Sequence, residues 1–391
     1  MFGLPLVNVI CAGITGCRKE SAIRNVISFL ENADPASRGS AGQQNVEGIL
    51  ETKVGVKWGT FLRTLNFASQ ERYAREILDE AISRLKPYRH RFLNLHLTLY
   101  HNNRFFAPFP LERITDFEPD LIVTFIEDVY AAWARVKKKS DTLQDPVKTY
   151  FRLRELMAWR SVEIMMADYL AMALRIPNFV VAVKHPPGML HSLLFHPSKL
   201  MVYSAYPISR FRREGSDHGK LAEDKKKLQS FLGKLQEKFI LFNPTTIDER
   251  ILRNLTTPLQ AGARWELPME QMVSEGDIQY PIPLSQPELN EIASDIDPNI
   301  KFRDFRLVRD VDCVVAYRPY WDGKVHEGVK SEIDQAQNLI IDSVFYFPGE
   351  DGKVDDSPFA GQASAYYRDE AEVIADLEKR VPRNQRQWGI R

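Results

Sequence analysis

The sequence predicts an α/β protein made of two Rossmann-like, three-layer domains with parallel sheets. Short runs rich in β-branched residues alternate with amphipathic helical segments in both halves of the chain, which is the pattern of βαβ units. The chain has 391 residues, which corresponds to two or three folding units at roughly 150 residues each. Apolar residues make up 44% of the chain and charged residues 27%, so there is enough apolar material for sizeable cores.

The first half is expected to form four strands and four helices. The strands are Leu6–Gly13, Phe92–Tyr100, Asp120–Glu127 and Asn178–Lys184, and the helices are Glu20–Glu31, Ser69–Leu85, Val129–Lys138 and Tyr150–Leu174. Small and polar residues over Glu31–Gln44 indicate a flexible surface loop. Two clusters of breaking residues, His185-Pro186-Pro187-Gly188 and His196-Pro197-Ser198-Lys199, indicate a domain boundary. We therefore expect domains over residues 1–190 and 199–391.

The second half repeats the alternation of strands and helices. The strands are Leu200–Ala205, Phe239–Phe242, Asp312–Tyr317 and Ser343–Phe347, and the helices are Asp217–Glu237, Val325–Asn338 and Arg368–Lys379. Residues 253–300 contain several prolines and are interpreted as an insertion with a helix after Ser285. The pattern assigns no role to this insertion.

Charge and cysteine usage exclude several classes of partner. Lys+Arg and Asp+Glu both number 52, so the chain has no global field that would attract nucleic acid or an anionic membrane. The three cysteines form no metal or redox motif, and no histidines are spaced for a metal site on a helix. No stretch of 18 apolar residues is present, and the apolar N-terminal segment lacks a basic leader. These features predict a cytoplasmic protein with reduced thiols, no membrane span and no bound structural metal.

A strand, turn and helix near the N-terminus carry the residues of a phosphate-binding loop. The predicted first strand runs into Gly13-Ile14-Thr15-Gly16-Cys17-Arg18-Lys19-Glu20-Ser21, and a helix follows. Such a turn places backbone N–H groups and the positive end of a helix around a phosphate, with a lysine and a hydroxyl beside it. The general pattern has glycine before the lysine and Ser or Thr after it, positions that Arg18 and Glu20 occupy here. Gly13, Gly16, Arg18, Lys19 and Ser21 are the candidate binding residues.

The loop GITGCRKES resembles that of archaeal-type adenylate kinases and related nucleoside monophosphate kinases, where the hydroxyl can stand two places after the lysine, as Ser21 does. Residues 92–110 resemble the third strand and following loop of that family, and residues 118–123 resemble its fourth strand. The resemblance covers about residues 5–185 and implies an ATP and Mg²⁺ site at this loop. Asn94 stands where the family has an acidic residue near the metal. Arg135, Arg154 and Arg160 are further candidates for phosphate contacts.

Three outcomes stay open for this loop: an active kinase, nucleotide binding without efficient transfer, and a degenerate loop that keeps the fold but binds nothing. Phosphoryl transfer depends on positioning and on neutralising charge, so the absence of an acidic residue at position 94 favours none of the three decisively.

The second half carries polar residues at strand ends and at the start of a helix. Tyr203, Ser209 and Arg210 lie in and after its first strand, and Phe242-Asn243-Pro244 ends its second. Asp304 precedes the strand that begins at Asp312. His326, Gly328 and Glu332 open the helix that follows. Ligands of open α/β sheets gather at the carboxyl ends of strands, so these residues are candidates for one site.

This order of motifs resembles nucleoside 2-deoxyribosyltransferases and their relatives, the nucleoside monophosphate N-glycosidases. The agreement covers about residues 199–350 and includes Gly328-Val329-Lys330-Ser331-Glu332 and the spacing of Asp304 from Asp312. His326 stands where the family has Asp or Ser, and Val329 replaces a common Thr. The resemblance implies a homo-oligomer and a glycosidic reaction that needs no cofactor.

Breaking a bond between sugar and base passes through an oxocarbenium-like state, which one carboxylate attacks or stabilises while another acidic group protonates or positions the base. Glu332 is the candidate nucleophile, placed in the first turn of its helix where the macrodipole favours the ionised form. Asp304 would orient the sugar or the base, and His326 would contact the substrate or act as an acid. Tyr203, Ser209, Arg210 and Gly328 would contact a hydroxyl or a 5′-phosphate. The alternative is that Glu332 is an ordinary helix acid and His326 a surface residue.

The sequence therefore predicts a nucleotide-metabolising enzyme, an N-glycosidase or deoxyribosyltransferase-like protein, whose first domain binds or phosphorylates a nucleotide. Two alternatives remain: a nucleoside monophosphate kinase with a non-catalytic second domain, and a nucleotide-sensing regulatory or defence protein. A nucleotide or nucleoside is the expected partner. The base, the sugar and the choice between hydrolysis and transfer stay open.

Overall fold

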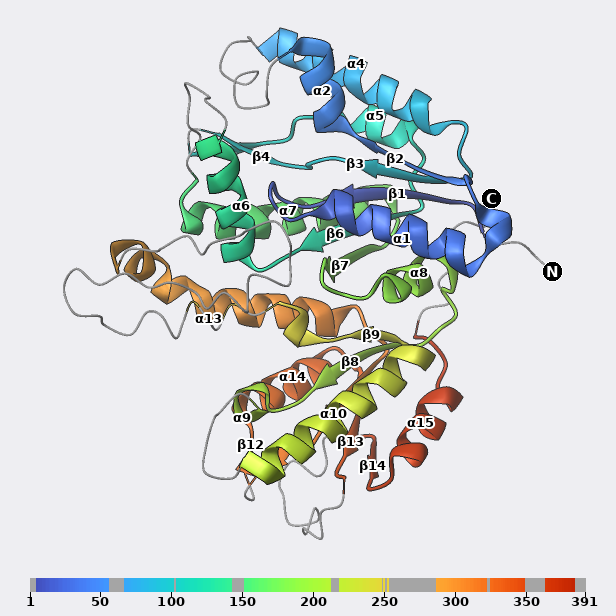
Figure 1. Cartoon of the computed structure of the whole chain (residues 1–391), viewed down its shortest axis with the longest axis vertical. Coiled ribbons are helices and arrows are strands. Elements are labelled where there is room, and N and C mark those ends of the chain that lie inside the picture. Colours follow the sequence, from blue (N-terminus) through green and yellow to red (C-terminus); the bar gives the residue numbers. More distant parts are fainter. Residues whose placement is uncertain are drawn as a thin grey trace. The chain divides into compact units, whose positions relative to one another are not determined.

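The computed structural model describes residues 5–55, 67–101, 103–142, 151–211, 218–247, 249, 252, 286–321, 324–348 and 363–383 (Figure 1). These residues form an α/β structure with two five-stranded parallel sheets, which confirms the predicted class. The chain divides into two compact units. The described parts of Met1–Pro187 and Ile247–Ile300 belong to the first unit, and those of Gly188–Thr246 and Lys301–Gln387 to the second.

The sheet of the first unit is built around the N-terminal strand. Its strands are β1 (Val7–Ala12), β2 (Ala41–Asn45), β3 (His90–Asn94), β6 (Leu121–Ile126) and β7 (Asn178–Ala182), in the order β2-β3-β1-β6-β7. Because the chain passes from one side of β1 to the other between β3 and β6, the end of β1 is a topological switch point.

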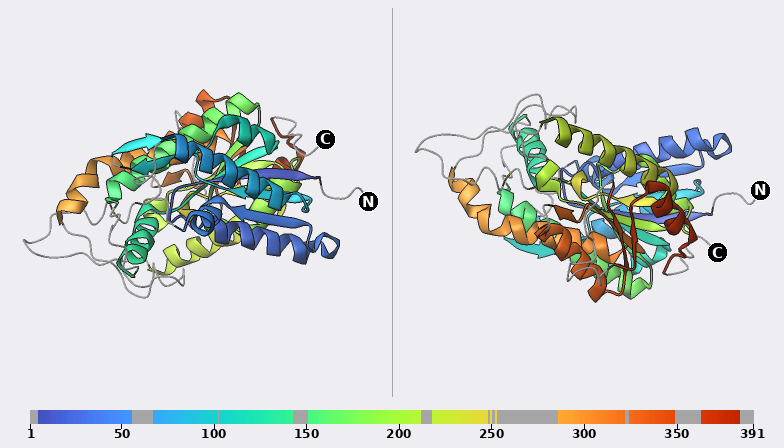
Figure 2. Two further views of the ribbon diagram at one scale, coloured as in Figure 1. Left: turned by 90° about the horizontal axis from the view of Figure 1, so that it is seen from above. Right: turned by 90° about the horizontal axis from the view of Figure 1, so that it is seen from below.

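Helices cover both faces of this sheet (Figure 2). Side chains of α2 (Val46–Val54), α4 (Phe67–Leu85), α5 (Leu111–Asp116) and α7 (Leu153–Leu174) share one core with Ile10, Leu93 and Ile122. The other face is covered by α1 (Lys19–Ala33), which buries Ile23, Val26 and Leu30. The unit also contains the helix α6 (Val129–Thr142) and the antiparallel hairpin of β4 (Leu99–His101) and β5 (Arg104–Phe106).

The second unit has the sheet order β14-β13-β10-β8-β9, which is one of the common doubly wound orders. The strands are β8 (Met201–Ala205), β9 (Ile240–Phe242), β10 (Cys313–Tyr317), β13 (Asp342–Tyr346) and β14 (Ala365–Tyr367). Side chains of α10 (His218–Lys238) and α15 (Glu370–Lys379) pack with Val202 and Val315 on one face. Because side chains alternate along a strand, Tyr203 and Val314 point to the opposite face, on which α14 (Glu327–Asn338) packs.

Several short elements connect these strands. They are α8 (Pro187–Phe195), α9 (Ile208–Phe211), the 3₁₀ turn η2 (Pro244–Thr246) and the hairpin of β11 (Tyr320–Trp321) and β12 (Lys324–Val325). The helix expected after Ser285 is present as α13 (Gln286–Arg309), a helix of 24 residues with Pro298 inside it. Its residues up to Ile300 group with the first unit and the rest with the second. The remainder of the predicted insertion, residues 253–285, lies outside the described residues.

The loop predicted over Glu31–Gln44 is wrong. This segment contains the 3₁₀ turn η1 (Pro35–Ser37) and most of β2. Its strand has no β-branched residue, so propensity does not reveal it. The backbone of β2 pairs with β3 instead, and Gly42 leaves room for the ring of Tyr88, which would lie 2.3 Å from an added Cβ atom.

The single strand predicted over Phe92–Tyr100 is also wrong, because β3 ends at Asn94 and β4 begins at Leu99. The N–H of Leu95 still donates to the carbonyl of Cys11 in β1 at 3.1 Å, but the rest of the backbone contacts described for this segment are to side chains. The ammonium of Lys19 binds the carbonyl of Leu95, and Glu163 accepts the N–H groups of Leu97 and Thr98. These contacts redirect the chain toward the end of β1.

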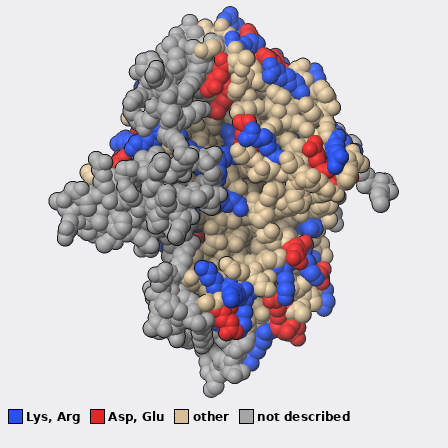
Figure 3. All heavy atoms as spheres, viewed as in Figure 1, with Lys and Arg blue, Asp and Glu red and all other residues tan. Residues whose placement is uncertain are grey.

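The surface carries charges of both signs. On the face drawn in Figure 3, Lys and Arg lie among Asp and Glu with no large patch of one sign over the coloured residues. Within the described parts of the chain, none of the helices is both long enough and apolar enough to cross a membrane.

The three thiols give a test of this packing. Cys11, Cys17 and Cys313 are free and buried, and burial raises the pKa of Cys17 to about 11 and that of Cys313 to about 12. At pH 8 fewer than about one Cys17 thiol in a thousand is therefore ionised. We expect no reaction with an aromatic disulfide reagent in the native protein and reaction of all three thiols in 6 M guanidinium, measured by absorbance. A thiol that reacts within seconds in the native protein would contradict the described cores.

Candidate active site and phosphate loop

The loop after β1 has the conformation that its two glycines permit. Gly13 has φ +143° and Gly16 has φ +78°, both in the region that side chains disfavour. A Cβ atom on Gly13 would lie 2.6 Å from the carbonyl oxygen of Phe125, and one on Gly16 would lie 2.6 Å from that of Ala132. Arg18 is left-handed as well, with φ 52°, at the position where the phosphate-loop pattern has glycine. The loop therefore keeps the glycine-like backbone at Arg18 without the glycine.

Lys19 is buried and its ammonium faces the loop. Its Nζ donates to the carbonyls of Gly13 at 2.8 Å and Leu95 at 2.9 Å, and lies 3.0 Å from Nδ1 of His96. The other ring nitrogen of His96 lies 2.6 Å from a carboxylate oxygen of Glu47. The cation predicted to reach a phosphate is thus beside the loop, where backbone carbonyls hold it.

A buried carboxylate that the sequence did not single out fixes the start of the loop. Glu163, in the middle of α7, accepts from the N–H groups of Gly13 at 3.1 Å, Leu97 at 2.8 Å and Thr98 at 2.7 Å. It also accepts from the hydroxyl of Thr98 at 2.5 Å. No local motif marks this residue, because a glutamate within a helix is ordinarily part of the solvated face.

Two of the three arginines proposed for phosphate contacts lie around the loop. Arg135 donates to the carbonyl of Gly16 at 2.8 Å and pairs with Glu127, which also lies 3.5 Å from Arg18. Arg160 donates to the carbonyl of Glu127 at 3.1 Å and pairs with the buried Glu249.

The third arginine, Arg154, pairs with Asp295 at 2.7 Å and is exposed, so it does not join the group around Glu127.

Ser21, Glu20 and Asn94 lie where the resemblance places the metal ion of a phosphate loop. Ser21 is half-buried and accepts from Arg24 at 3.3 Å, one turn further along α1. Glu20 accepts from the amide of Asn45 at 3.1 Å. Asn94 is buried in register with Asn45, and its Oδ1 has no hydrogen-bond partner among the residues that the structure describes. In the part of the chain that the structure describes, no group of three or more metal-ligating side chains is present.

In the second unit Tyr203 contacts Glu332, and Asp304 lies within electrostatic range of the same phenol. The hydroxyl of Tyr203 donates to Oε1 of Glu332 at 2.7 Å. Burial raises the pKa of Tyr203 well above its usual value of 10, and the charges of Glu332 and Asp304 raise it further. Both carboxylates therefore lie within electrostatic range of one phenol that stays protonated at neutral pH. We call Tyr203, Glu332, Asp304 and the adjacent Arg303 the carboxylate cluster.

Burial distinguishes this cluster from a surface ion pair. Tyr203 is fully buried, and Glu332, Asp304 and Arg303 are 7%, 9% and 5% exposed. Glu332 lies on the buried stripe of α14 with Val329, Ile333 and Ala336, at a position where a helix packed on a sheet usually has an apolar residue. A buried carboxylate on that stripe needs a partner, which the phenol supplies.

One part of the prediction for Glu332 is wrong. Because α14 begins at Glu327, Glu332 lies in its second turn rather than its first. The macrodipole acts mainly within the first turn, so the hydrogen bond from Tyr203 is the contact that stabilises this carboxylate.

The remaining candidates lie near the start of α14 or near the end of β8. His326 is the residue before α14 and is half-buried, and its N–H donates to the carbonyl of Pro319 at 3.2 Å. Gly328 is exposed, and a Cβ atom there would meet His326 only at ordinary contact distance. Ser209 and Arg210 belong to α9, but their side chains lie outside the described residues.

The asparagine of the Phe-Asn-Pro motif contacts the end of β8. The hydroxyl of Tyr206 lies 2.8 Å from Oδ1 of Asn243 and 3.0 Å from the hydroxyl of Thr245. Tyr317, another aromatic residue near the predicted site, points to the opposite face of the sheet and packs against Phe231 and Tyr346. It therefore belongs to the core rather than to the carboxylate cluster.

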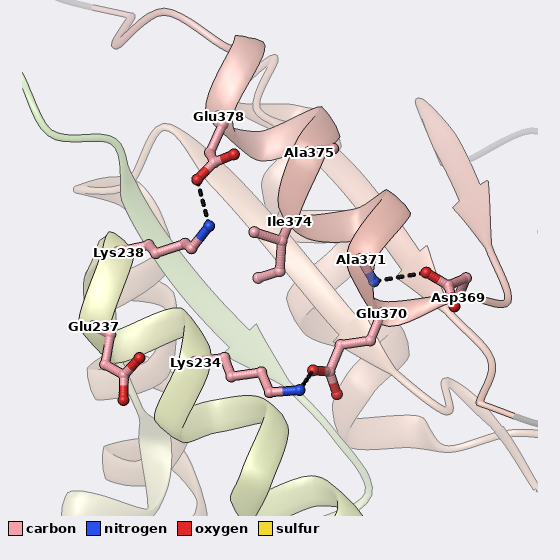
Figure 4. A pocket seen from close by; sticks show the side chains of 9 residues that line it. All are labelled: Lys234, Glu237, Lys238, Asp369, Glu370, Ala371, Ile374, Ala375 and Glu378. Carbon is pink, nitrogen blue, oxygen red and sulfur yellow. Dashed lines mark hydrogen bonds and ion pairs between the residues drawn. The ribbon is translucent and has the colours of Figure 1, made fainter.

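A surface pocket of about 520 Å³ lies between α10 and α15 (Figure 4). Ion pairs join Lys234 to Glu370 and Lys238 to Glu378, and Ile374 lies between them. Because α10 and α15 pack on the face of the sheet opposite Tyr203, this pocket is separate from the carboxylate cluster. Exposed ion pairs of this kind contribute little to stability, because water screens them.

No family model matches this chain, and no curated protein matches it. The assignment of the sites therefore rests on their residues and geometry.

The phosphate loop yields a prediction about stability. We expect Gly16→Ala to lower the free energy of unfolding by about 3 kcal/mol, because it combines a disfavoured φ with backbone overlap. Gly55→Ala is the matched control, since Gly55 has φ +70° but nothing within 4 Å of an added Cβ atom, and should cost only about 1 kcal/mol. Urea unfolding followed by tryptophan fluorescence measures both. Equal losses would show that the contact with Ala132 is not as tight as described.

Proposed function

We propose that this chain is a nucleotide-metabolising enzyme whose second unit cleaves or exchanges the N-glycosidic bond of a nucleotide. The observation that carries the proposal is the buried hydrogen bond between Tyr203 and Glu332 beside Asp304. Two carboxylates near one phenol, on α14 and α13 at one face of the sheet, are the groups that glycosidic chemistry uses.

The reaction assigns a different task to each side chain. An oxygen of Glu332 attacks the anomeric carbon while the bond to the base breaks, and the base leaves with the bonding electron pair and gains a proton. Water, or the nitrogen of a second base, then attacks the same carbon and releases Glu332 as a carboxylate. Tyr203 holds Glu332 ionised and oriented between turnovers, and Asp304 contacts the substrate.

The first unit is proposed to bind nucleotide phosphates at the loop 13–19. The left-handed backbone at Gly16 and Arg18, the start of α1 and the buried Lys19 support phosphate binding. A bound Mg²⁺ ion would neutralise phosphate charge there, next to Glu20 and Ser21. Lys19 and the backbone amides of the loop would orient the phosphates.

Loss of the proposed nucleophile should abolish base release. We expect Glu332→Gln to lower the rate on the order of 10⁴-fold, because the amide keeps the size of the side chain but cannot attack carbon. The measurement is chromatography of free base after incubation with each nucleoside and nucleoside monophosphate. Glu327→Gln is the matched control, since Glu327 is exposed in the first turn of the same helix, and it should retain normal activity. Unimpaired turnover by Glu332→Gln would exclude Glu332 as nucleophile.

The alternative function is a nucleoside monophosphate kinase with a non-catalytic second unit, which the geometry of the phosphate loop favours. The two functions differ in product: free base in one case, ADP from ATP and a nucleoside monophosphate in the other. Binding of ATP with neither product would support the third possibility, a nucleotide sensor.

Nucleotide binding should depend on Lys19 whichever product forms. We expect Lys19→Met to weaken ATP binding by about 10- to 100-fold in calorimetric titration, the range for loss of a charged hydrogen bond. Lys53→Met should bind ATP normally, because Lys53 pairs with Glu76 and Glu80 on the surface of the same unit. Base release by Lys19→Met should match the wild type. Unchanged ATP affinity in Lys19→Met would contradict a phosphate site at the loop.

A further inference from the structure

We infer that Arg303 is a positioning residue that keeps Asp304 ionised beside Glu332, so that Asp304 accepts a hydrogen bond from a sugar hydroxyl and does not protonate the leaving base. This inference rests on the proposed glycosidic function. It assigns Asp304 to the sugar, where the sequence left open whether this residue orients the sugar or the base, and it adds a residue that belongs to neither sequence motif.

The contact between the two side chains is specific. Nε of Arg303 lies 2.9 Å from Oδ1 of Asp304, and Nη2 lies 2.8 Å from the same oxygen. Both residues are at least nine-tenths buried. Water therefore screens this pair little, and each charge depends on its neighbours for stabilisation.

The position of this pair on α13 makes the contact unusual. Neighbouring residues of a helix point about 100° apart and do not ordinarily face each other. Arg303 and Asp304 meet only because both side chains turn toward the same buried space. Arg303 thus acts on the direction of the Asp304 carboxylate as well as on its charge.

Three elements supply charged or titratable groups that share the surroundings of Tyr203 with Asp304. Glu332 of α14 adds a second negative charge, and Tyr203 of β8 adds a neutral hydroxyl group. Two carboxylates that share a buried site cannot both ionise cheaply, so one takes up a proton unless a cation lies close by. Arg303 of α13 is that cation, and it lowers the pKa of Tyr203 where the two carboxylates raise it.

An ionised Asp304 accepts hydrogen bonds and cannot donate one. The substrate group that it recognises must therefore be a donor, and the sugar hydroxyls of a nucleotide or nucleoside are such donors. The proton that the departing base requires must come from another group or from water.

The pH profile tests the role of Arg303. We expect Arg303→Met to move the acidic limb of the kcat/KM profile for base release upward by about one pH unit or more, because Asp304 then takes a proton at higher pH. Arg303→Lys should restore most of the profile, since it keeps the charge. Arg309→Met is the matched control on the same helix, because Arg309 is half exposed, and it should leave the profile unchanged. Thermal midpoints confirm that each variant is folded.

A substrate with a cationic base, such as N7-methylguanosine or its monophosphate, tests the role of Asp304. Such a base leaves without gaining a proton, so it rescues variants that lack a proton donor. We expect Asp304→Asn to be impaired equally on this substrate and on the unmodified one. Rescue by the cationic base would show that Asp304 is the acid and overturn the inference.

These results are distinguishable from failure of the proposed function. If the wild-type protein releases no base from any substrate, the glycosidic proposal fails and this inference falls with it. If base is released but the profile of Arg303→Met stays unchanged, the glycosidic proposal stands and the role of Arg303 is refuted.

Discussion

Both units depend on one constraint: each buried carboxylate must be stabilised by hydrogen bonds or by an opposite charge. A carboxylate removed from water costs several kcal/mol unless hydrogen bonds or an opposite charge replace its hydration. In the first unit Glu163 obtains this compensation from the backbone N–H groups of Gly13, Leu97 and Thr98. In the second unit a phenol hydrogen-bonds Glu332 and a guanidinium pairs with Asp304. At both sites the acidic side chain of a helix is hydrogen-bonded to, or paired with, the loop, strand or neighbouring side chain that stabilises its charge.

The groups that stabilise each buried carboxylate differ between the two units. Backbone amides bind Glu163, whereas side chains bind the acids of the carboxylate cluster. Backbone amides cannot move without moving the chain, so Glu163 fixes the path of the loop after β1 and the break between β3 and β4. Side-chain partners such as Tyr203 and Arg303 instead set the charge and direction of a carboxylate while the strand stays in place. The carboxylate cluster is therefore the better candidate for chemistry, because its acids are tuned by groups that can respond to a substrate.

Sequence patterns predicted the strands whose residues have both a high β propensity and the apolar character that a buried strand requires. Strands β1, β6, β8 and β10 are rich in β-branched or apolar residues and occur close to their expected bounds. Strand β2, with the sequence Ala-Gly-Gln-Gln-Asn, could not be predicted, because pairing with β3 determines it rather than propensity. That Tyr203, Glu332 and Asp304 serve one site is a prediction from the order of motifs and from the family resemblance that this order carries. Arg303 and Glu163 could not be found in this way, because the sequence does not show whether a charged residue on a helix is buried or exposed.

The phosphate loop shows what nucleotide binding would require of the first unit. Lys19 already donates to the carbonyls of Gly13 and Leu95, and a phosphate that captured its ammonium would remove those bonds. A buried carbonyl left without a donor costs about 1–3 kcal/mol, so the loop or the segment around Leu95 must rearrange to recover part of that cost. Because Glu163 holds Gly13, Leu97 and Thr98 together, such a rearrangement would act on the end of β1 and the start of β4 at once. Binding of a nucleotide at this loop would therefore be coupled to a change in backbone conformation.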